Sequence, residues 1–295
     1  MRRINHKWGK VQVPKLGWVG FHATRAWNEI ESATSARVTL DRAGRWFASF
    51  TAAPPELKRE STGAIAGLDM GVASTVTTSN REHLGMPALL SPGEEQRKRR
   101  LQRKLSRQKK GSNRRESTKH QIARLSAREA DRRKDWIEKT TTRLVLDYDI
   151  ICLEDLKVKN MTRSARGTIE SPGRNVAQKR GLNCSISPQA WALFHQRLTD
   201  KAAAATSPVA VVVVNPAYTS LRCSGCGHTQ KENRKSQAVF SRQSCGYTDN
   251  ADVNAAKNIL AAGLAVTGRG GTPHEDPATD LHSDPMKRQP LVLVA

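Results

Sequence analysis

Residues 64–79, AIAGLDMGVASTVTTS, decide the fold. The apolar run 64–68 predicts a buried strand, and Asp69 follows it where another apolar residue would extend the strand. Gly71 permits a tight turn, and the alternating β-branched residues of 72–79 predict the second strand of a hairpin. Burial of a lone carboxylate is costly, so Asp69 is a candidate metal ligand, although most aspartates at strand ends bind turn amides instead.

The chain is strongly basic. Its 295 residues hold 49 lysines and arginines against 27 acidic residues, which gives a net charge of +22 and an isoelectric point of about 10.4. A charge excess of this size predicts a polyanionic partner, most simply nucleic acid. At this length the chain can bury a full core, and two or three modules are expected.

Nothing in the sequence indicates export or a membrane anchor. The basic N-terminus, MRRINHKWGK, lacks the apolar stretch of a signal peptide, and the longest apolar run, residues 209–214, is too short to span a bilayer. The five cysteines, an odd number partly arranged as CxxC, fit a reduced compartment and a metal site better than a set of disulfides. We therefore expect a soluble, cytoplasmic protein.

The first 60 residues have the pattern of β-strands. Residues 11–21 and 36–50 both alternate, and the turn sequence 41–44 makes the second stretch a hairpin. Two or three strands cannot close a barrel. Either the chain begins inside a β domain, or these strands pair with the module that follows.

A charged segment follows the Asp69 hairpin. Residues 97–134 contain 17 lysines and arginines against three acids and contribute +14 to the net charge. The break at residues 111–113 predicts two helices within 93–139. A solvated helical hairpin is one reading, but a patch of one sign repels itself without an anionic partner, so we favour contact with phosphates. The candidate nucleic-acid-binding residues are Arg97, Lys98, Arg99, Arg100, Arg103, Lys104, Arg107, Lys109, Lys110, Arg114 and Arg115.

The next segments predict an α/β core with a mixed sheet. A helix over 136–146 precedes the strand 148–153, and a helix beginning at 187–189 precedes the strand 209–214, an order typical of a parallel crossover. Glu154 and Asp155 end the first of these strands and cannot both point into one site, since side chains alternate. Residues 160–185 are expected to form a long basic loop.

Three cysteines have the spacing of an incomplete zinc ribbon. Cys223 and Cys226 lie in TSLRCSGCGH and Cys245 in FSRQSCGYTDN, but Arg242 stands where the second CxxC needs its first cysteine. Three cysteines leave a tetrahedral Zn²⁺ one ligand short, and the guanidinium opposes the cation. His228 is a candidate substitute, and a loop that binds no metal is the alternative.

A last helix is predicted over 250–264, with Asp252 in its first turn. The helix macrodipole alone explains an acid there. However, Asp69, Glu154 and Asp252 stand at the ends of two strands and the start of a helix, an arrangement that can bring three carboxylates to one sheet edge. Such a cluster would bind one or two Mg²⁺ ions for phosphodiester cleavage.

These segments together resemble the OrfB/TnpB family of insertion-sequence proteins, RuvC-like nucleases thought to be ancestral to type V CRISPR effectors and commonly labelled transposases. The matching stretches, in the family's order, are VPKLGWV, GRWFASF, GLDMGV, RLQRKLSRQKKGSN, ICLEDLKVKNM, PAYTSLRCSGCGH and CGYTDNADVNAAKNIL. They cover about residues 10–265.

The resemblance implies an RNase H-like catalytic domain with Asp69, Glu154 and Asp252 as its Mg²⁺-binding triad. It also implies a zinc ribbon before the last acid, and RNA-guided cleavage of DNA, with guide RNA and DNA as partners. The expected division is a partial β wedge module over 1–60, a RuvC-like domain over 61–218 that includes the basic hairpin 93–139, a zinc-ribbon-like insertion over 219–249, the last RuvC-like helix over 250–265 and a disordered tail over 266–295.

Two features depart from the family pattern. Members usually begin with a longer N-terminal part that grips the guide RNA and the target duplex, and this chain starts after it. Arg242 removes one zinc ligand. The intact triad favours an active endonuclease over the nuclease-dead branch of the family. The alternative is a catalytically inactive DNA- or RNA-binding remnant or regulator.

Overall fold

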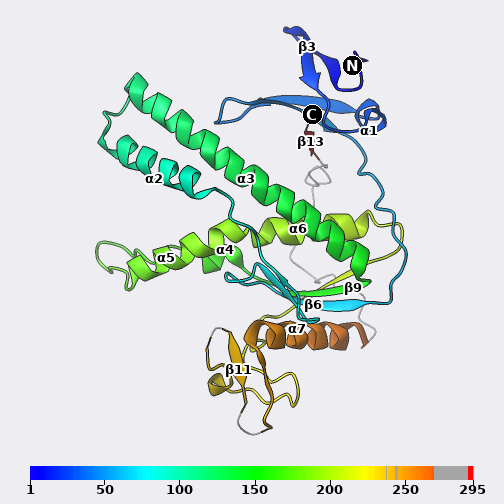
Figure 1. The fold of residues 1–295 in the computed structure, drawn as a ribbon, viewed down its shortest axis with the longest axis vertical. Helices are drawn as coiled ribbons and strands as arrows, with labels where there is room; N and C mark the ends of the chain where they lie inside the picture. The colour runs from blue at the N-terminus through cyan, green and yellow to red at the C-terminus, as the bar shows by residue number, and fades with distance from the viewer. Residues whose placement is uncertain (237, 243–244, 269–291, 295) are drawn as a thin grey trace. The chain divides into compact units, whose positions relative to one another are not determined.

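The computed structural model describes residues 1–236, 238–242, 245–268 and 292–294 (Figure 1). The chain divides into two compact units. The first comprises the described residues of 1–56, 88–132 and 278–295, and the second those of 57–87 and 133–277. No helix among the described residues is both long enough and apolar enough to cross a membrane.

Two small antiparallel sheets form the β part of the first unit. The strands β1 (Arg2–Arg3), β2 (Trp8–Val13) and β3 (Gly17–His22) make one sheet, β4 (Ser35–Leu40) and β5 (Trp46–Thr51) make the other with β13 (Val292–Val294), and α1 (Trp27–Glu31) lies between them in the chain. The single predicted stretch 11–21 is a hairpin instead, because Lys15 and Gly17 adopt positive φ and turn the chain. Phe21, Trp27 and Phe50 pack in its core.

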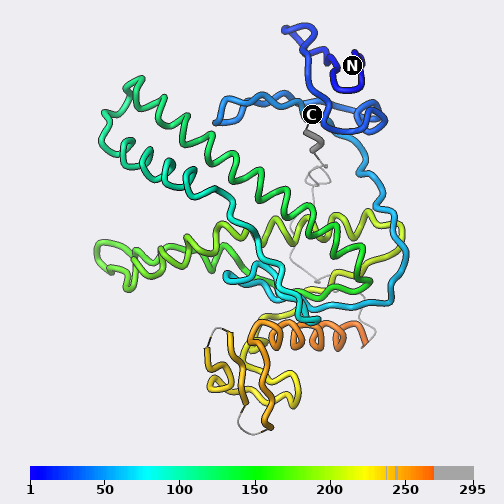
Figure 2. The backbone as a smooth tube through the Cα atoms, in the orientation of Figure 1, coloured from blue at the N-terminus to red at the C-terminus, as the bar shows by residue number. Residues whose placement is uncertain are grey.

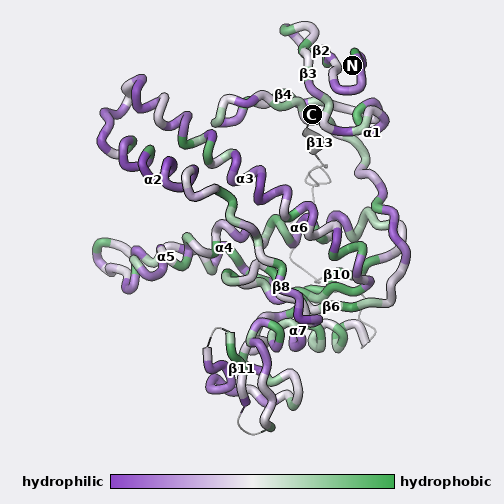
Figure 3. The backbone as a smooth tube through the Cα atoms, viewed as in Figure 1, coloured by the Kyte–Doolittle hydropathy of each residue, from purple (hydrophilic) through white to green (hydrophobic). Residues whose placement is uncertain are grey.

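The helices α2 (Pro92–Arg107) and α3 (Asn113–Asp147) confirm the two helices predicted on either side of residues 111–113. Ser91 and Glu94 form a capping box that starts α2. Leu101 and Leu125 are buried, whereas most other residues here are hydrophilic (Figure 3). The backbone reverses between the two helices (Figure 2), and α3 contributes residues to both units.

A five-stranded mixed sheet is the centre of the second unit, as predicted. Its order is β10-β9-β6-β7-β8, where β6 is Ile65–Asp69, β7 Val76–Thr78, β8 His83–Leu84, β9 Ile150–Glu154 and β10 Ala210–Val214. The strands β6, β9 and β10 are parallel, and β7 and β8 are antiparallel. The predicted hairpin after Asp69 is confirmed by the pairing of β6 with β7.

One face of this sheet packs on the second half of α3 and on α6 (Trp191–Ala203), which follows the short 3₁₀ helix Ser187–Gln189. Leu68 and Leu153 point into this core and meet Leu144 and Phe194, all four at most 2% exposed. The apolar contacts hold the parallel strands in register, so that their carboxyl ends lie side by side.

The basic loop predicted for residues 160–185 is wrong in part. The segment contains α4 (Val158–Met161), and its end forms α5 (Val176–Ile186). Bonds between the two helices stabilise α5: Lys179 Nζ lies 2.6 Å from the Met161 carbonyl oxygen, and the Asn183 amide lies 2.8 Å from that of Thr162. Tertiary contacts therefore override a composition that favours a loop.

The helix α7 (Ala251–Gly268) packs on the opposite face of the sheet, as Figure 1 shows. Gly67 permits this close approach, since a Cβ on Gly67 would stand 2.1 Å from the carbonyl oxygen of Ala256. Farther along α7, a Cβ on Gly263 would stand 2.3 Å from the sulfur of Cys152. Of the tail predicted for residues 266–295, 266–268 belong to α7, 292–294 form β13, and the remainder lies outside the described residues.

Candidate functional site

The structure brings Asp69 and Glu154 to the same end of the sheet. Gly67 faces α7, so Asp69, two residues further along β6, faces the same side. Cys152 likewise faces α7, so Glu154 on the neighbouring strand does too. Leu68 pairs with Leu153 in the parallel register, which sets the two acids next to each other.

Asp252 joins this end of the sheet from the first turn of α7. The electrostatic coupling of the three carboxyls shows in the pKa of Asp69. Burial raises that pKa from its ordinary value to about 7, and the charges of Glu154 and then Asp252 raise it further. Three acids at a site short of cations therefore stand where the sequence predicted them, and a cation bound there would relieve their repulsion.

A hydroxyl bond orients Glu154. Its pKa is raised by burial, and a hydrogen bond donated by the Thr219 hydroxyl lowers it in part. The adjacent Asp155 forms an ion pair with Lys157 at 2.6 Å instead. Of the two acids at the end of β9, Glu154 is thus the one that couples to Asp69.

Arg234 is a charged neighbour of the acids that the sequence pattern did not identify. It follows the 3₁₀ helix Lys231–Asn233, and its guanidinium nitrogen lies 3.2 Å from Asp252 Oδ1. Its charge also lowers the pKa of Asp69, against the larger raising effects. Arg234 lies in the charged run KENRK, where no local pattern separates it from its neighbours.

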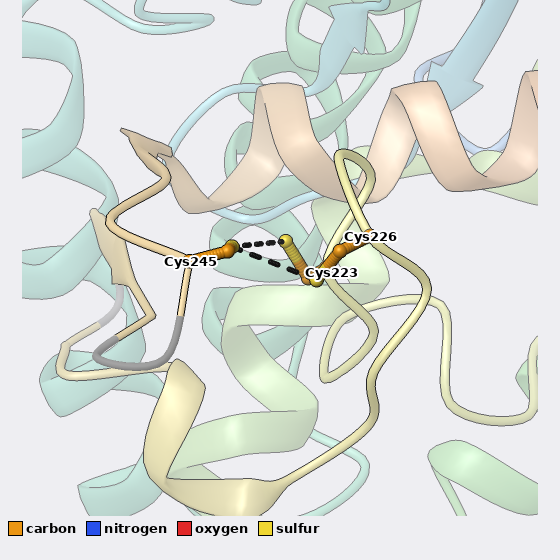
Figure 4. A group of neighbouring side chains, drawn as sticks. All are labelled: Cys223, Cys226 and Cys245. Atoms are coloured by element: carbon orange, nitrogen blue, oxygen red, sulfur yellow. Dashed lines mark hydrogen bonds between the residues drawn. The ribbon is translucent and has the colours of Figure 1, made fainter.

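The three cysteines of the predicted ribbon form a cluster (Figure 4). Their sulfurs lie within 4.8 Å of one another, with Cys226 and Cys245 at 3.5 Å and Cys223 and Cys245 at 3.9 Å. A cluster of this kind can hold a metal ion such as Zn²⁺. His228, the candidate substitute ligand, does not join the group found among the described residues, and its carbonyl accepts the Cys223 N–H.

The remaining two cysteines are separate from this cluster. Cys184 is exposed on α5, and Cys152 is fully buried on β9, where burial raises the pKa of its thiol to about 11. A thiol with so high a pKa is inert at neutral pH and serves as packing.

Side-chain amides of α7 attach the cysteine loops to the acidic site. The Asn254 side chain accepts the Ser224 N–H at 2.9 Å and donates to the Arg222 carbonyl at 2.8 Å. The Asn258 amide donates to the Thr219 carbonyl at 2.8 Å, and Thr219 in turn binds Glu154. The same loop therefore positions the cysteines and a partner of the acidic site.

Asp249 on β12 (Thr248–Asn250), which pairs with β11 (Val239–Ser241), is a second attachment point. Its side chain is 1% exposed and accepts from the Tyr247 hydroxyl at 2.6 Å. It also pairs with Lys257 of α7 at 2.7 Å and with Arg81 at 2.9 Å. Burial alone would raise the pKa of Asp249, but the bonds from Lys257 and Tyr247 outweigh it and lower the pKa.

Most of the eleven predicted nucleic-acid-binding side chains on α2 and α3 are exposed. Three are engaged within the chain: Lys98 with Glu129 at 2.5 Å, Arg99 with Glu95 at 2.7 Å, and Arg115 with the Gln108 carbonyl at 3.2 Å. Eight have no ion pair with an acid in the part of the chain that the structure covers, namely Arg97, Arg100, Arg103, Lys104, Arg107, Lys109, Lys110 and Arg114.

Two family models match the chain. Residues 49–165, which contain Asp69 and Glu154, match OrfB_IS605, described as "Probable transposase". Residues 191–259, which contain the three clustered cysteines and Asp252, match the Cas12f1-like TNB domain.

Curated relatives agree with these matches. The chain is 39% identical over 265 residues to an Escherichia coli K12 protein named "Putative RNA-guided DNA endonuclease InsQ", with 90% of this chain and 64% of the relative covered. It is 33% identical over 242 residues to a "Putative RNA-guided DNA endonuclease" of Streptomyces pristinaespiralis, with 80% and 54% covered. The chain thus spans less than two thirds of the length of either relative.

A solved structure titled as a complex of Cas12f1 with single guide RNA and target DNA is similar at 16% identity and a TM-score of 0.48, over 76% of this chain and 46% of that one. The family models and the identity over most of its length decide the assignment: the chain belongs to the OrfB/TnpB family of insertion-sequence proteins.

Proposed function

We propose that this chain contains the RuvC-like, RNase H-like catalytic domain of a transposon-encoded DNA endonuclease, with Asp69, Glu154 and Asp252 as its acidic triad. The single observation that carries the proposal is the pKa of Asp69, raised by burial and by the charges of Glu154 and Asp252. Buried carboxylates that repel one another are typical of a site built for a cation.

The donor set fits Mg²⁺, which prefers carboxylate oxygens and, when bound, would stabilise the attacking and leaving oxygens of the phosphodiester. The chain's own residues prepare the site. Asp69 must lose its proton to act as a ligand, and Thr219 holds one oxygen of Glu154 so that the other stays available. Arg234 pairs with Asp252 and can move its charge to a substrate phosphate when the carboxylate binds metal.

DNA and a guide RNA are the proposed partners. They are named for the relatives and for the similar solved structure, and the basic surface of α2 and α3 supplies the matching charge. We assign the cysteine cluster a structural metal, Zn²⁺, that holds its loops against α7 beside the acids.

The alternative function is a catalytically inactive nucleic-acid-binding protein. The observation that favours it is the Arg234–Asp252 ion pair, because it supplies the acids with a cation from the protein itself. In this case binding of nucleic acid persists, it weakens steeply with salt, and no metal-dependent product forms.

Cleavage of labelled single- and double-stranded DNA, with Mg²⁺ or EDTA, tests the proposal on protein purified with any RNA that accompanies it. We expect product with Mg²⁺, none with EDTA, and none from Asp69→Ala, which should still bind DNA. Asp155→Asn is the matched control, since this adjacent acid pairs with Lys157, and it should cleave normally. Cutting that survives Asp69→Ala contradicts the triad, and binding without cutting by every variant favours the inactive protein.

A further inference from the structure

The cysteine cluster has an arginine where a fourth zinc ligand is expected. Arg242 Nη1 lies 3.9 Å from the sulfur of Cys245, and its Nε is buried without a hydrogen-bond partner. The side chain is therefore held beside the cluster. This contact assigns a role to the residue that departs from the four-cysteine pattern.

We propose that the cluster is a three-thiolate zinc site with an open fourth position, and that Arg242 compensates its charge. The inference rests on the zinc assignment above. Three thiolates and one Zn²⁺ carry a net charge of −1, and a guanidinium beside one of the sulfurs neutralises it. Arg242 thus stabilises the loaded site, which corrects the expectation that its charge opposes the cation.

The sulfur positions suit the ion. A Zn–S bond of about 2.3 Å with tetrahedral angles separates two sulfurs by about 3.8 Å. The distances from Cys245 to Cys226 and to Cys223 are 3.5 Å and 3.9 Å. Zinc can therefore bind the three sulfurs with little movement of the backbone, releasing three protons if all start as thiols.

Both loops keep the backbone of a metal-binding knuckle despite the substitution. Cys226 is followed by Gly227 at φ +75°, and Cys245 is followed by Gly246 at φ +70°. The left-handed glycine turns each loop back, so that backbone N–H groups face the sulfur side. The Arg242 N–H closes the second loop on the Tyr247 carbonyl at 2.9 Å.

Water is the proposed fourth ligand. No fourth cysteine, histidine or acid joins the three thiols within the described ranges. Three protein ligands and one exchangeable position are the arrangement of open zinc sites. The chain thus differs from a closed structural ribbon by one ligand that solvent can replace.

Titration of the full-length, metal-free, reduced protein with Co²⁺ and Zn²⁺ tests the inference without DNA or cleavage, so its outcome is independent of nuclease activity. We expect one ion per chain, a tetrahedral Co²⁺ spectrum, and protection of Cys223, Cys226 and Cys245 from alkylation while Cys184 reacts. Arg242→Cys should raise the thiolate-to-Co²⁺ charge-transfer intensity by about a third, since four thiolates replace three.

Arg242→Gln separates charge from ligand number. It keeps a polar side chain of similar reach, and loss of the charged bond to sulfur should weaken Zn²⁺ binding about tenfold. Cys245→Ser should lose the site. The inference is overturned if Arg242→Gln binds Zn²⁺ as tightly as the natural protein, if the natural protein already shows the four-thiolate spectrum of Arg242→Cys, or if Zn²⁺ protects no cysteine. Circular dichroism confirms that each variant is folded, and Arg242→Gln alone still decides the question if Arg242→Cys misfolds.

Discussion

Gly67 of β6 lies directly beneath the backbone of α7 at Ala256, where a Cβ would stand 2.1 Å from the Ala256 carbonyl oxygen and 2.7 Å from the Leu260 nitrogen. The contact sets the distance between the strand that carries Asp69 and the helix that carries Asp252. The separation of these two acids is therefore fixed by the absence of a side chain two residues before Asp69.

Gly67→Ala should separate the strand from the helix. Backbone cannot yield as a flexible side chain does, so we expect a loss of at least about 2 kcal/mol in the free energy of unfolding. Urea denaturation measures it. Gly181→Ala is the control, since no atom lies within 4 Å of a Cβ there and alanine suits the interior of α5, so it should stabilise by about 0.5–1 kcal/mol. Equal stability of the two variants would contradict the close packing.

Asp69 should make the metal-free protein less stable as pH rises. Its folded pKa of about 7 exceeds its ordinary value of 3.8, so the folded state binds more protons than the unfolded state between these pH values. Stability is then lost as pH rises through this window and levels off above about 7. In EDTA, Asp69→Asn should be more stable than the natural protein at pH 8, on the order of 3 kcal/mol, and equally stable near pH 4.

Denaturation at pH 4, 6 and 8 with Asp155→Asn as the control tests this. Asp155 is an exposed acid paired with Lys157, and its replacement should not change the pH profile. A natural protein whose stability does not fall between pH 4 and pH 7 would show that Asp69 is not buried among like charges.

Local chemistry made the hairpin after Asp69 and the two basic helices predictable. Gly71 and the glycine at 111 are turn residues flanked by clear strand and helix patterns, so neither element needs distant contacts to be identified. The three acids were also predictable, because each interrupts or begins an apolar element.

The partners of those acids were not predictable. Thr219 bonds to Glu154 across 65 positions, and Arg234 to Asp252 across 18, and nothing local marks either residue. The buried face of α7 also differs from the apolar pattern, since Ile259 and Gly263 are buried while Leu260 is only partly so. Close packing on Gly67 and Cys152 selects small residues, which hydropathy does not reveal.

Thr219→Val should shift the metal dependence of the site to higher pH. The hydroxyl bond lowers the pKa of Glu154, so its loss raises that pKa and makes the carboxylate a weaker ligand near neutrality. Mg²⁺ affinity measured by calorimetry from pH 6 to 9 should show a higher midpoint pH. Thr219→Ser keeps the hydroxyl and should behave like the natural protein. The role fails if valine and serine act alike.

Asp249→Asn should loosen the cysteine loops from α7. The folded pKa is lowered because the bonds from Lys257 and Tyr247 outweigh burial, so the stabilisation is present at pH 7 and lost as pH falls through that lowered pKa. We expect a loss of about 1–3 kcal/mol at pH 7 that shrinks in acid. Asp135→Asn removes an exposed pair with Lys139 and should cost less than about 0.5 kcal/mol. Equal costs for the two variants would contradict the role of Asp249.

The unpaired arginines of α2 should bind phosphates, whereas the paired lysine should not. Arg100, Arg103 and Arg107 recur every three to four residues and so lie along one side of the helix, exposed and without an acidic partner among the described residues. Replacing all three by Gln should reduce the slope of log affinity against log salt on duplex DNA by up to about 3, at about 0.9 per phosphate contact. Lys98→Gln breaks the internal pair with Glu129 and should lower stability while leaving the slope unchanged. Fluorescence anisotropy across a salt series distinguishes the two. An unchanged slope in the triple variant would assign the charge of α2 to solvation alone, and a slope reduced by Lys98→Gln would show that its ion pair opens when DNA binds.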